Sequence, residues 1–242
     1  MKVYQPEKVH RIILKISGEF LAGPKRFGFD HDTLENLIDD IVEIKRLGLR
    51  IGIVIGGGNI FRGVEGAENS GIERVTGDNV GMLATVQNAL VVSDYLKRRN
   101  ILSEVYSAFK IDRIVKFYTP NRALTSFQEG KVCFFCGGTG NPFFTTDTAA
   151  VLRAIELKVN LVMKGTKVNG IYSADPVKDK KAVFIEDITY DEVLAKKLNV
   201  MDMTAFSLAR ENDINMKIFN VGAKGQFKEA VLKNNVGTFV HN

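Results

Sequence analysis

Short apolar runs alternate with longer stretches of helical periodicity along this chain. The run RIILKIS over residues 11–17 is mostly apolar and is typical of a strand buried on both faces. From Asp32 to Leu47, apolar residues recur every three or four positions, which predicts an amphipathic helix capped by Asp32 and followed by Gly48. The same criteria predict further strands over 50–55, 131–136, 161–164 and 217–221, and further helices over 79–96, 146–157, 190–198, 204–212 and 227–233.

This alternation of strands and helices predicts an α/β protein. Such a pattern is typical of a mostly parallel central sheet with helices on both faces. The 242 residues suit one large domain, and neither an internal repeat nor a linker rich in Pro, Gly or Ser divides them. We therefore expect a three-layer α/β/α sandwich in a single domain over residues 1–242, with two lobes.

Composition and charge exclude several classes of protein. The 33 Lys and Arg residues exceed the 28 Asp and Glu residues, and the net charge of +5 suits an anionic ligand such as a nucleotide. The basic residues are not clustered as nucleic-acid binding would require. No apolar run approaches the roughly 20 residues that span a bilayer, and residues 1–10 lack a signal-peptide core. We expect a soluble, cytoplasmic protein that binds neither membrane nor nucleic acid.

The two cysteines, Cys133 and Cys136, form a C-x-x-C pair that is also seen in redox and zinc sites. Both lie inside an apolar predicted strand. Residues three apart on a strand face opposite sides of the sheet, so the two sulfur atoms would diverge. The pattern therefore favours two buried thiols of the core.

Three turns that contain glycine follow predicted strands, over 15–18 (KISG), 56–59 (GGGN) and 137–141 (GGTGN). Ligands gather at the carboxyl ends of strands in open α/β sheets, and glycines let backbone N–H groups approach an anion. A single such turn is most simply a tight connection, but three at corresponding places favour a phosphate site. The P-loop motif is absent, and Phe61 replaces the last glycine of the dinucleotide fingerprint.

Five segments identify the family that the chain resembles. They are KISGEFLAG from Lys15, VIGGGNIFRG from Val54, VTGDNVGMLATVQNAL from Val75, GGTGNPFFTTDTAAVLRAIEL from Gly137 and KGTKVNGIYSADP from Lys164. These segments occur in the same order as in the bacterial uridylate (UMP) kinases of the amino-acid-kinase fold family. From His10 to Val240, the chain closely resembles that family. The resemblance implies Mg²⁺-dependent transfer of the ATP γ-phosphoryl group to UMP in pyrimidine nucleotide biosynthesis. It also implies that the N-terminal lobe mainly binds acceptor and phosphate, and that the C-terminal lobe mainly binds ATP.

The resemblance assigns roles in catalysis and ATP binding. Lys15, Arg62 and Lys164 would neutralise the charge of the transferring phosphoryl group, and Asp147 and Asp175 would organise Mg²⁺ or the catalytic lysines. On the residues alone, Lys164 is also compatible with a surface charge at a strand end. The implied ATP-binding positions are Lys15, Ser17, Gly18, Gly58, Arg62, Thr166, Tyr172 and Asp175.

A second set of positions is implied to bind UMP. It comprises Gly57, Asp78, Thr139, Gly140, Asn141, Pro142, Phe143, Phe144, Thr145 and Thr146. An Asp before a helix is usually an N-cap, so the role of Asp78 depends on the resemblance. Phe143 and Phe144 are equally compatible with the core, and we expect at least one of them to be buried.

The implied reaction needs no general base. A phosphate monoester has a second pKa of about 6, so the acceptor oxygen of UMP is already ionised near neutral pH. Positioning and charge neutralisation then suffice. No side chain is assigned as a direct metal ligand, and Mg²⁺ would bind through the nucleotide phosphates.

The loop over residues 23–28 matches the segment through which many family members receive GTP as an activator. It consists of Gly23, Pro24, Lys25, Arg26, Phe27 and Gly28. A flexible basic loop without a ligand explains this sequence as simply. The family also implies inhibition by UTP and assembly into hexamers. Residues 109–130 resemble the family least.

Two rival functions remain: a kinase of the same fold that acts on a carboxylate or carbamate, and a nucleotide sensor without catalysis. The segment GTGNPFFTTD argues against the first rival, and retention of Lys15, Arg62, Asp147 and Asp175 argues against the second.

Overall fold

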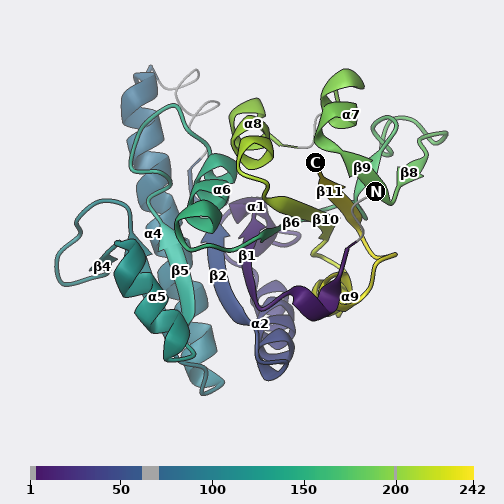
Figure 1. Cartoon of the computed structure of the whole chain (residues 1–242). Coiled ribbons are helices and arrows are strands. Elements are labelled where there is room, and N and C mark those ends of the chain that lie inside the picture. Colours follow the sequence, from purple (N-terminus) through teal and green to yellow (C-terminus); the bar gives the residue numbers. More distant parts are fainter. Residues whose placement is uncertain (1–3, 62–70, 199–200) are drawn as a thin grey trace.

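A computed structural model of the chain describes residues 4–61, 71–198 and 201–242 (Figure 1). Within these ranges, nine strands form one sheet in the order β4-β3-β5-β2-β1-β6-β10-β11-β9. Strands β10 and β11 pair antiparallel, and the other neighbours pair parallel, as predicted. The strands are β1 (Arg11–Ile16), β2 (Arg50–Ile55), β3 (Ser103–Ser107), β4 (Lys116–Phe117), β5 (Val132–Cys136), β6 (Leu161–Thr166), β9 (Asp187–Thr189), β10 (Asn215–Asn220) and β11 (Thr238–His241).

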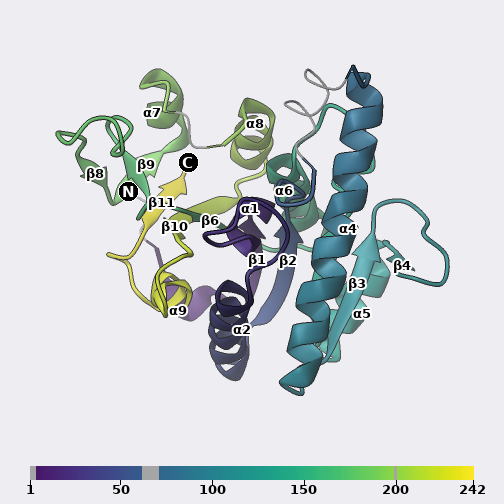
Figure 2. The same ribbon diagram turned by 180° about the vertical axis from the view of Figure 1, so that it is seen from behind.

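Helices cover both faces of this sheet, which confirms the three-layer α/β/α sandwich. One face, turned toward the viewer in Figure 2, is covered by α2 (His31–Arg46), α4 (Arg74–Arg98) and α9 (Gln226–Leu232). The other face, turned toward the viewer in Figure 1, is covered by α5 (Pro120–Gln128), α6 (Thr146–Glu156), α7 (Tyr190–Ala195) and α8 (Met203–Glu211). The side chains of β1 alternate accordingly, because Leu14 packs under α2 and Ile13 packs under α6.

Helix α2 confirms the predicted apolar stripe but not the predicted cap. Leu34, Ile38 and Ile41 are buried against the sheet. The cap lies two residues earlier than predicted, because the carboxylate of Asp30 accepts the Thr33 N–H at 3.0 Å. Asp32 lies in the first turn instead, where its charge is still favourable toward the helix dipole.

Helix α4 is longer than predicted, since it begins at Arg74 rather than at residue 79. Thr76 and Gly77 are typical of a turn in sequence, yet Gly77 is buried inside the helix. At the other end, the Arg99 guanidinium lies 3.0 Å from the Asp39 carboxylate of α2. In the part of the chain that the structure describes, no helix, α4 included, is both long and apolar enough to cross a membrane.

The sequence patterns missed several short elements. The missed elements of the large sheet and its helices are β3, β4, α5, β9 and β11. The pattern also missed the 3₁₀ turn Pro6–Lys8, α1 (Gly18–Leu21) and a two-stranded ribbon of β7 (Ile171–Tyr172) and β8 (Phe184–Ile185). These elements have two to nine residues, too few for a periodic pattern to stand out.

The two cysteines confirm the prediction that they are core thiols. Cys133 packs on the α5 and α6 side of the sheet, whereas Cys136 packs on the α2 and α4 side. Burial raises the pKa of both thiols to about 12, so neither is a thiolate near neutral pH.

Asp40 of α2 gives the fold a predicted sensitivity to pH. Burial raises the pKa of its carboxyl group to about 6, although the Gly225 N–H donates to it at 3.1 Å. The folded state therefore binds the Asp40 proton more tightly than the unfolded chain. The contribution of Asp40 to stability falls as the pH rises from about 4, the pKa in the unfolded chain, to about 6, the pKa in the folded state. We expect Asp40→Asn to raise the free energy of unfolding at pH 7.5 by about 1 kcal/mol, allowing for partial solvation.

Urea unfolding of wild type and Asp40→Asn between pH 4 and pH 8 measures this effect. Asp112→Asn makes the same chemical change at an exposed position and should leave stability unchanged. Equal pH profiles for wild type and Asp40→Asn would show that the Asp40 proton is not linked to folding.

Candidate active site

Two lysines and one aspartate form a buried ionic cluster where β1, β6 and α6 meet. Lys15 and Lys164 are direct neighbours in the parallel register of β1 and β6, so their side chains leave the same face of the sheet. The Nζ atom of Lys15 lies 2.6 Å from Oδ1 of Asp147, and Nζ of Lys164 donates to Oδ2 at 2.6 Å. The side chains of Lys15, Asp147 and Lys164 are only 11%, 10% and 12% exposed.

The start of α6 places Asp147 in this cluster. Thr145 caps the helix, since its hydroxyl accepts the N–H groups of Asp147 and Thr148. Ala150 and Ala154 are buried where α6 packs on the sheet. This packing places the first turn of α6, which contains Asp147, over the two lysines. The carboxylate also lies near the positive end of the helix dipole.

The electrostatics of the cluster favour an added anion. Burial opposes ionisation of Asp147, but the charges of Lys15 and Lys164 outweigh burial and hold the pKa of the carboxyl group below its ordinary value. Burial lowers the pKa of Lys164, and the Asp147 charge offsets part of this effect. The three side chains together bring two positive charges and one negative charge into a poorly solvated place.

The three glycine turns lie side by side because β5, β2 and β1 are neighbours in the sheet. The turn after β1 packs directly on the turn after β2, since a Cβ atom on Gly18 would come within 2.8 Å of the Gly58 nitrogen. The turn after β5 begins at Gly137 with φ of +75°, a left-handed conformation that favours glycine. The predicted gathering of these turns is therefore present.

A cavity of about 220 Å³, the α4 pocket, contains most of the positions expected to bind UMP. Six of those positions line it: Gly57, Asp78, Asn141, Phe144, Thr145 and Thr146. Met82 and Thr85 of α4 form its wall, and Gly138 closes it from the turn after β5.

A second cavity of about 690 Å³, the β6 pocket, contains three positions expected to bind ATP. Thr166, Tyr172 and Asp175 line it, together with Lys164. Because Thr146 lines the α4 pocket and Lys164 lines the β6 pocket, the ionic cluster around Asp147 lies between the two.

The loop after the third turn differs from the sequence expectation. Phe143 and Phe144 are 65% and 50% exposed, so the expectation that at least one belongs to the core is wrong. The loop turns away from the sheet here, and Phe143 has a φ of +71°. Before it, the Thr139 hydroxyl accepts the Asn141 N–H at 3.2 Å, and residues 140–142 complete the bend.

Asp78 lies inside α4 rather than at its N-terminus, so it is not an N-cap. Its carboxylate accepts the Nε–H of Arg74 at 3.0 Å and the Phe143 N–H at 2.8 Å. The residue thereby ties α4 to the loop that carries the other predicted UMP contacts.

Three further predicted positions have different outcomes. Asp175 and Asp147 were both expected to organise Mg²⁺ or the lysines. The Asp175 carboxylate accepts the Val177 N–H of its own loop at 2.9 Å. The Asp147 carboxylate contacts both lysines. Within the loop over 23–28, Lys25 lies 3.5 Å from Asp30. Arg62 lies outside the described residues.

Sequence reasoning missed the role of Asp202. Its carboxylate caps α8 and also accepts hydrogen bonds from the hydroxyls of Thr145 and Thr148, so it fixes the start of α6. Asp202 lies two residues before the helix predicted over 204–212, so the sequence indicates at most an N-cap and not the bonds to the start of α6. Thr85 and Asn88 of α4 were also missed, because their burial becomes visible only in the folded structure.

The side chains that the structure describes do not form a metal centre. Among the described residues, no group of three His, Cys, Asp or Glu side chains could hold a metal ion. Both carboxylate oxygens of Asp147 face ammonium groups, which leaves this residue poorly disposed as a metal ligand.

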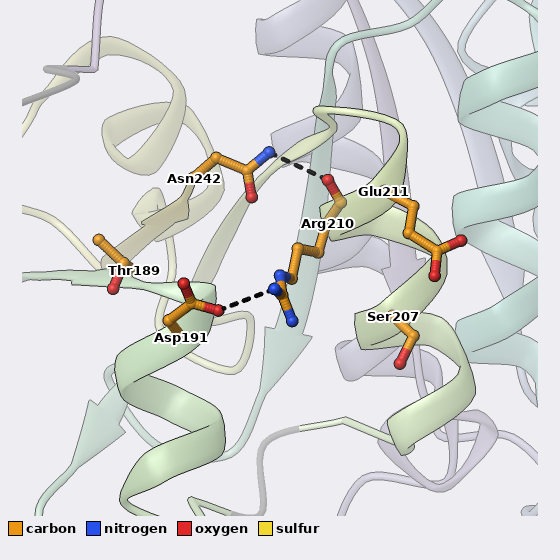
Figure 3. Close-up of a pocket in the computed structure, with 6 residues that line it drawn as sticks. All are labelled: Thr189, Asp191, Ser207, Arg210, Glu211 and Asn242. Carbon is orange, nitrogen blue, oxygen red and sulfur yellow. Dashed lines mark hydrogen bonds and ion pairs between the residues drawn. The ribbon is translucent and has the colours of Figure 1, made fainter.

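A further hollow of about 560 Å³ lies between α7, α8 and the C-terminal residue (Figure 3). The Arg210 guanidinium lies 3.2 Å from the Asp191 carboxylate, and the Asn242 amide donates to the Arg210 carbonyl at 3.0 Å. The hollow contains none of the predicted site residues.

Comparison with known protein families matches residues 10–220 to the amino acid kinase family. The chain belongs to the amino acid kinase family. The family expected from the sequence motifs is thus confirmed.

Solved structures of this family superpose closely on the chain. UMP kinase from Bacillus anthracis is 34% identical, with 96% of each chain covered and a TM-score of 0.92. UMP kinase from Ureaplasma parvum is 35% identical, with 97% of this chain and 100% of that chain covered, again at a TM-score of 0.92. Uridylate kinase from Archaeoglobus fulgidus is 23% identical over 95% of this chain and 99% of its own, and its TM-score of 0.73 shows the shared fold.

Asp147→Asn should destabilise the protein strongly, because it removes the charge of the carboxylate that both buried ammonium groups contact. We expect the free energy of unfolding at pH 7.5 to fall by about 3 kcal/mol. Pyrophosphate should restore more stability to the variant than to wild type, since an anion can replace the missing carboxylate. Thermal unfolding with and without pyrophosphate measures both effects.

Asp94→Asn is the matched control, because Asp94 forms an exposed pair with Arg98 on α4 and should contribute less than about 1 kcal/mol. Equal losses in the two variants would contradict a special role for the buried cluster. The stabilisation from ionised Asp147 is present above pH 4 and is lost as the pH falls through the lowered pKa.

Proposed function

We propose that the chain is a UMP kinase, which transfers the γ-phosphoryl group of ATP to UMP and forms ADP and UDP. The observation that carries the proposal is the position of the Lys15–Asp147–Lys164 cluster between the α4 pocket and the β6 pocket. The match to two UMP kinases, at 34% and 35% identity over nearly the whole chain, supports UMP as the acceptor.

In this proposal the cluster stabilises charge in the transition state. Lys15 and Lys164 carry ammonium groups fixed by rigid neighbouring strands, so little reorganisation is needed when negative charge shifts between the phosphates. Asp147 holds both ammonium groups at hydrogen-bond distance and offsets their mutual repulsion until the phosphates enter. It acts through the lysines as a positioning residue and has no role as a general base.

The acceptor chemistry agrees with this arrangement. The phosphate of UMP is mostly dianionic near neutral pH, because its second pKa is about 6. Its oxygen can attack the γ-phosphorus without prior deprotonation, and the bond to the β-bridging oxygen of ATP breaks as the new P–O bond forms. The positively charged cluster then compensates the charge of the phosphates.

Each pocket is proposed to receive one nucleotide. UMP would occupy the α4 pocket, with Gly57, Asp78 and the segment 139–146 around it. ATP would occupy the β6 pocket, with Tyr172 beside the adenine and Ser17, Gly18 and Gly58 beside the phosphates. Arg62 is proposed to contact the transferring phosphoryl group, because a guanidinium fork binds two phosphate oxygens at once.

Mg²⁺ is proposed to enter with ATP, bound by the phosphate oxygens. Magnesium usually retains waters and bridges substrate phosphates, so it needs no protein cage.

Regulation, assembly and location complete the proposal. The loop over 23–28 exchanges backbone and side-chain hydrogen bonds with Asn59 of the second glycine turn, which supports a link between a GTP site there and the phosphates. Inhibition by UTP, assembly into hexamers, a cytoplasmic location, a place in pyrimidine nucleotide biosynthesis and the division of labour between two lobes stay predictions.

ADP release tests the proposed acceptor. With ATP and Mg²⁺ present, we expect kcat/KM for UMP to exceed that for CMP and AMP by at least about 100-fold, because a site built to hydrogen-bond one base rejects the others. Carbamate and acetylglutamate should give no turnover. Turnover with a carboxylate but not with UMP would favour the rival kinase, and nucleotide binding without any turnover would favour a sensor.

A further inference from the structure

One side of α4 carries polar residues where an apolar stripe is expected. Asp78, Gly81, Thr85 and Asn88 lie within an arc of about 80° on the helix, given 100° per residue. This side faces the glycine turns, since a Cβ atom on Gly57 would come within 2.7 Å of the Gly81 carbonyl oxygen. A helix that packs on a sheet normally buries apolar residues there.

Thr85 holds the third glycine turn. Its hydroxyl accepts the Gly137 N–H at 2.8 Å and donates to the Met82 carbonyl at 2.6 Å. Gly137 bends sharply away from β5, so its N–H would lack a partner without this bond. Thr85 is 3% exposed, so water cannot readily replace it.

Asn88 holds the second glycine turn through a pair of buried amides. Its Nδ2 group donates to the Gly56 carbonyl at 2.6 Å and to Oδ1 of Asn59 at 2.7 Å, and its Oδ1 accepts the Asn59 amide at 3.0 Å. Asn88 and Asn59 are fully buried. The Asn59 amide also donates to the Gly28 carbonyl, which joins the loop over 23–28 to the same network.

These bonds fix the spacing between turns that come from different strands. One rigid helix contacts the turn after β2 through Asn88, the turn after β5 through Thr85, and the loop at Phe143 through Asp78. Another buried polar residue of α4, Ser93, bonds Ser103 of β3 instead and touches none of the turns.

We propose that Thr85 and Asn88 are positioning residues for phosphoryl transfer, and that α4 serves as the template that sets the acceptor site. This inference rests on the proposed UMP kinase activity. Thr85 acts on the α4 pocket, because it lies in the wall of that pocket and holds Gly137 beside Gly138. Asn88 acts on both substrates, because it holds the turn that packs against Gly18 at the phosphate positions of ATP.

Thr85→Val tests the first assignment, since valine keeps the shape and removes the hydroxyl. Leaving one buried N–H unpaired should raise KM for UMP by about 10-fold, with KM for ATP changed by less than about 2-fold. Thr85→Ser restores the hydroxyl and should restore KM for UMP. An equal rise in both KM values, or no rise in either, would overturn the assignment.

Asn88→Asp tests the second assignment, because it removes both donated hydrogen bonds at nearly constant volume. We expect kcat/KM to fall at least about 10-fold for both substrates. Ser93→Ala is the control and should stay within about 2-fold of wild type. A fall confined to one substrate, or a fall of the same size in Ser93→Ala, would refute the role of Asn88.

Hydrogen–deuterium exchange separates this inference from the proposed function. Thr85→Val should speed exchange of peptides that cover 137–141, and Asn88→Asp should speed exchange of those that cover 56–59. This readout needs no turnover, so it stands even if wild type fails to phosphorylate UMP. Unchanged exchange at both turns would overturn the template role whatever the substrate is.

Discussion

The whole site depends on one interaction, the bonding of a single buried carboxylate to two buried ammonium groups. Lys15 and Lys164 are brought together by backbone pairing, because their strands are adjacent and their positions are in register. Two buried cations at this separation would repel each other and lose solvation. Asp147 contacts both ammonium groups and offsets part of their repulsion, and it comes from a helix that crosses the same face of the sheet.

The surrounding structure can be understood as support for this cluster. Thr145 and Asp202 fix the first turn of α6 and therefore the carboxylate. The glycine turns follow the neighbouring strands β1, β2 and β5, and α4 holds two of those turns from the opposite face of the sheet. Anion-binding groups thus converge from both faces on the carboxyl ends of the central strands.

The sequence predicted those parts of the molecule that depend on local patterns. The apolar runs of β1 and β2 and the stripe of α2 are long enough to reveal buried strands and a helix, and the glycine turns follow from residue types alone. Register is not local, so the meeting of Lys15 with Lys164 could be expected only through resemblance to a family. Phe143 and Phe144 were misjudged because aromatic rings are usually buried, whereas this loop turns away from the core. The polar contacts of Asp202 and Asn88 link residues far apart in sequence, and composition does not encode such pairs.

Helix α4 has a mechanical consequence for the molecule. Its 25 residues form a rod about 37 Å long, which lines the α4 pocket near one end and meets α2 through Arg99 at the other. A tilt of about 3° at the α2 end moves the far end by about 2 Å, more than a hydrogen bond tolerates. A movement where α2 meets the end of α4 would therefore be transmitted along α4 to the residues that line the α4 pocket.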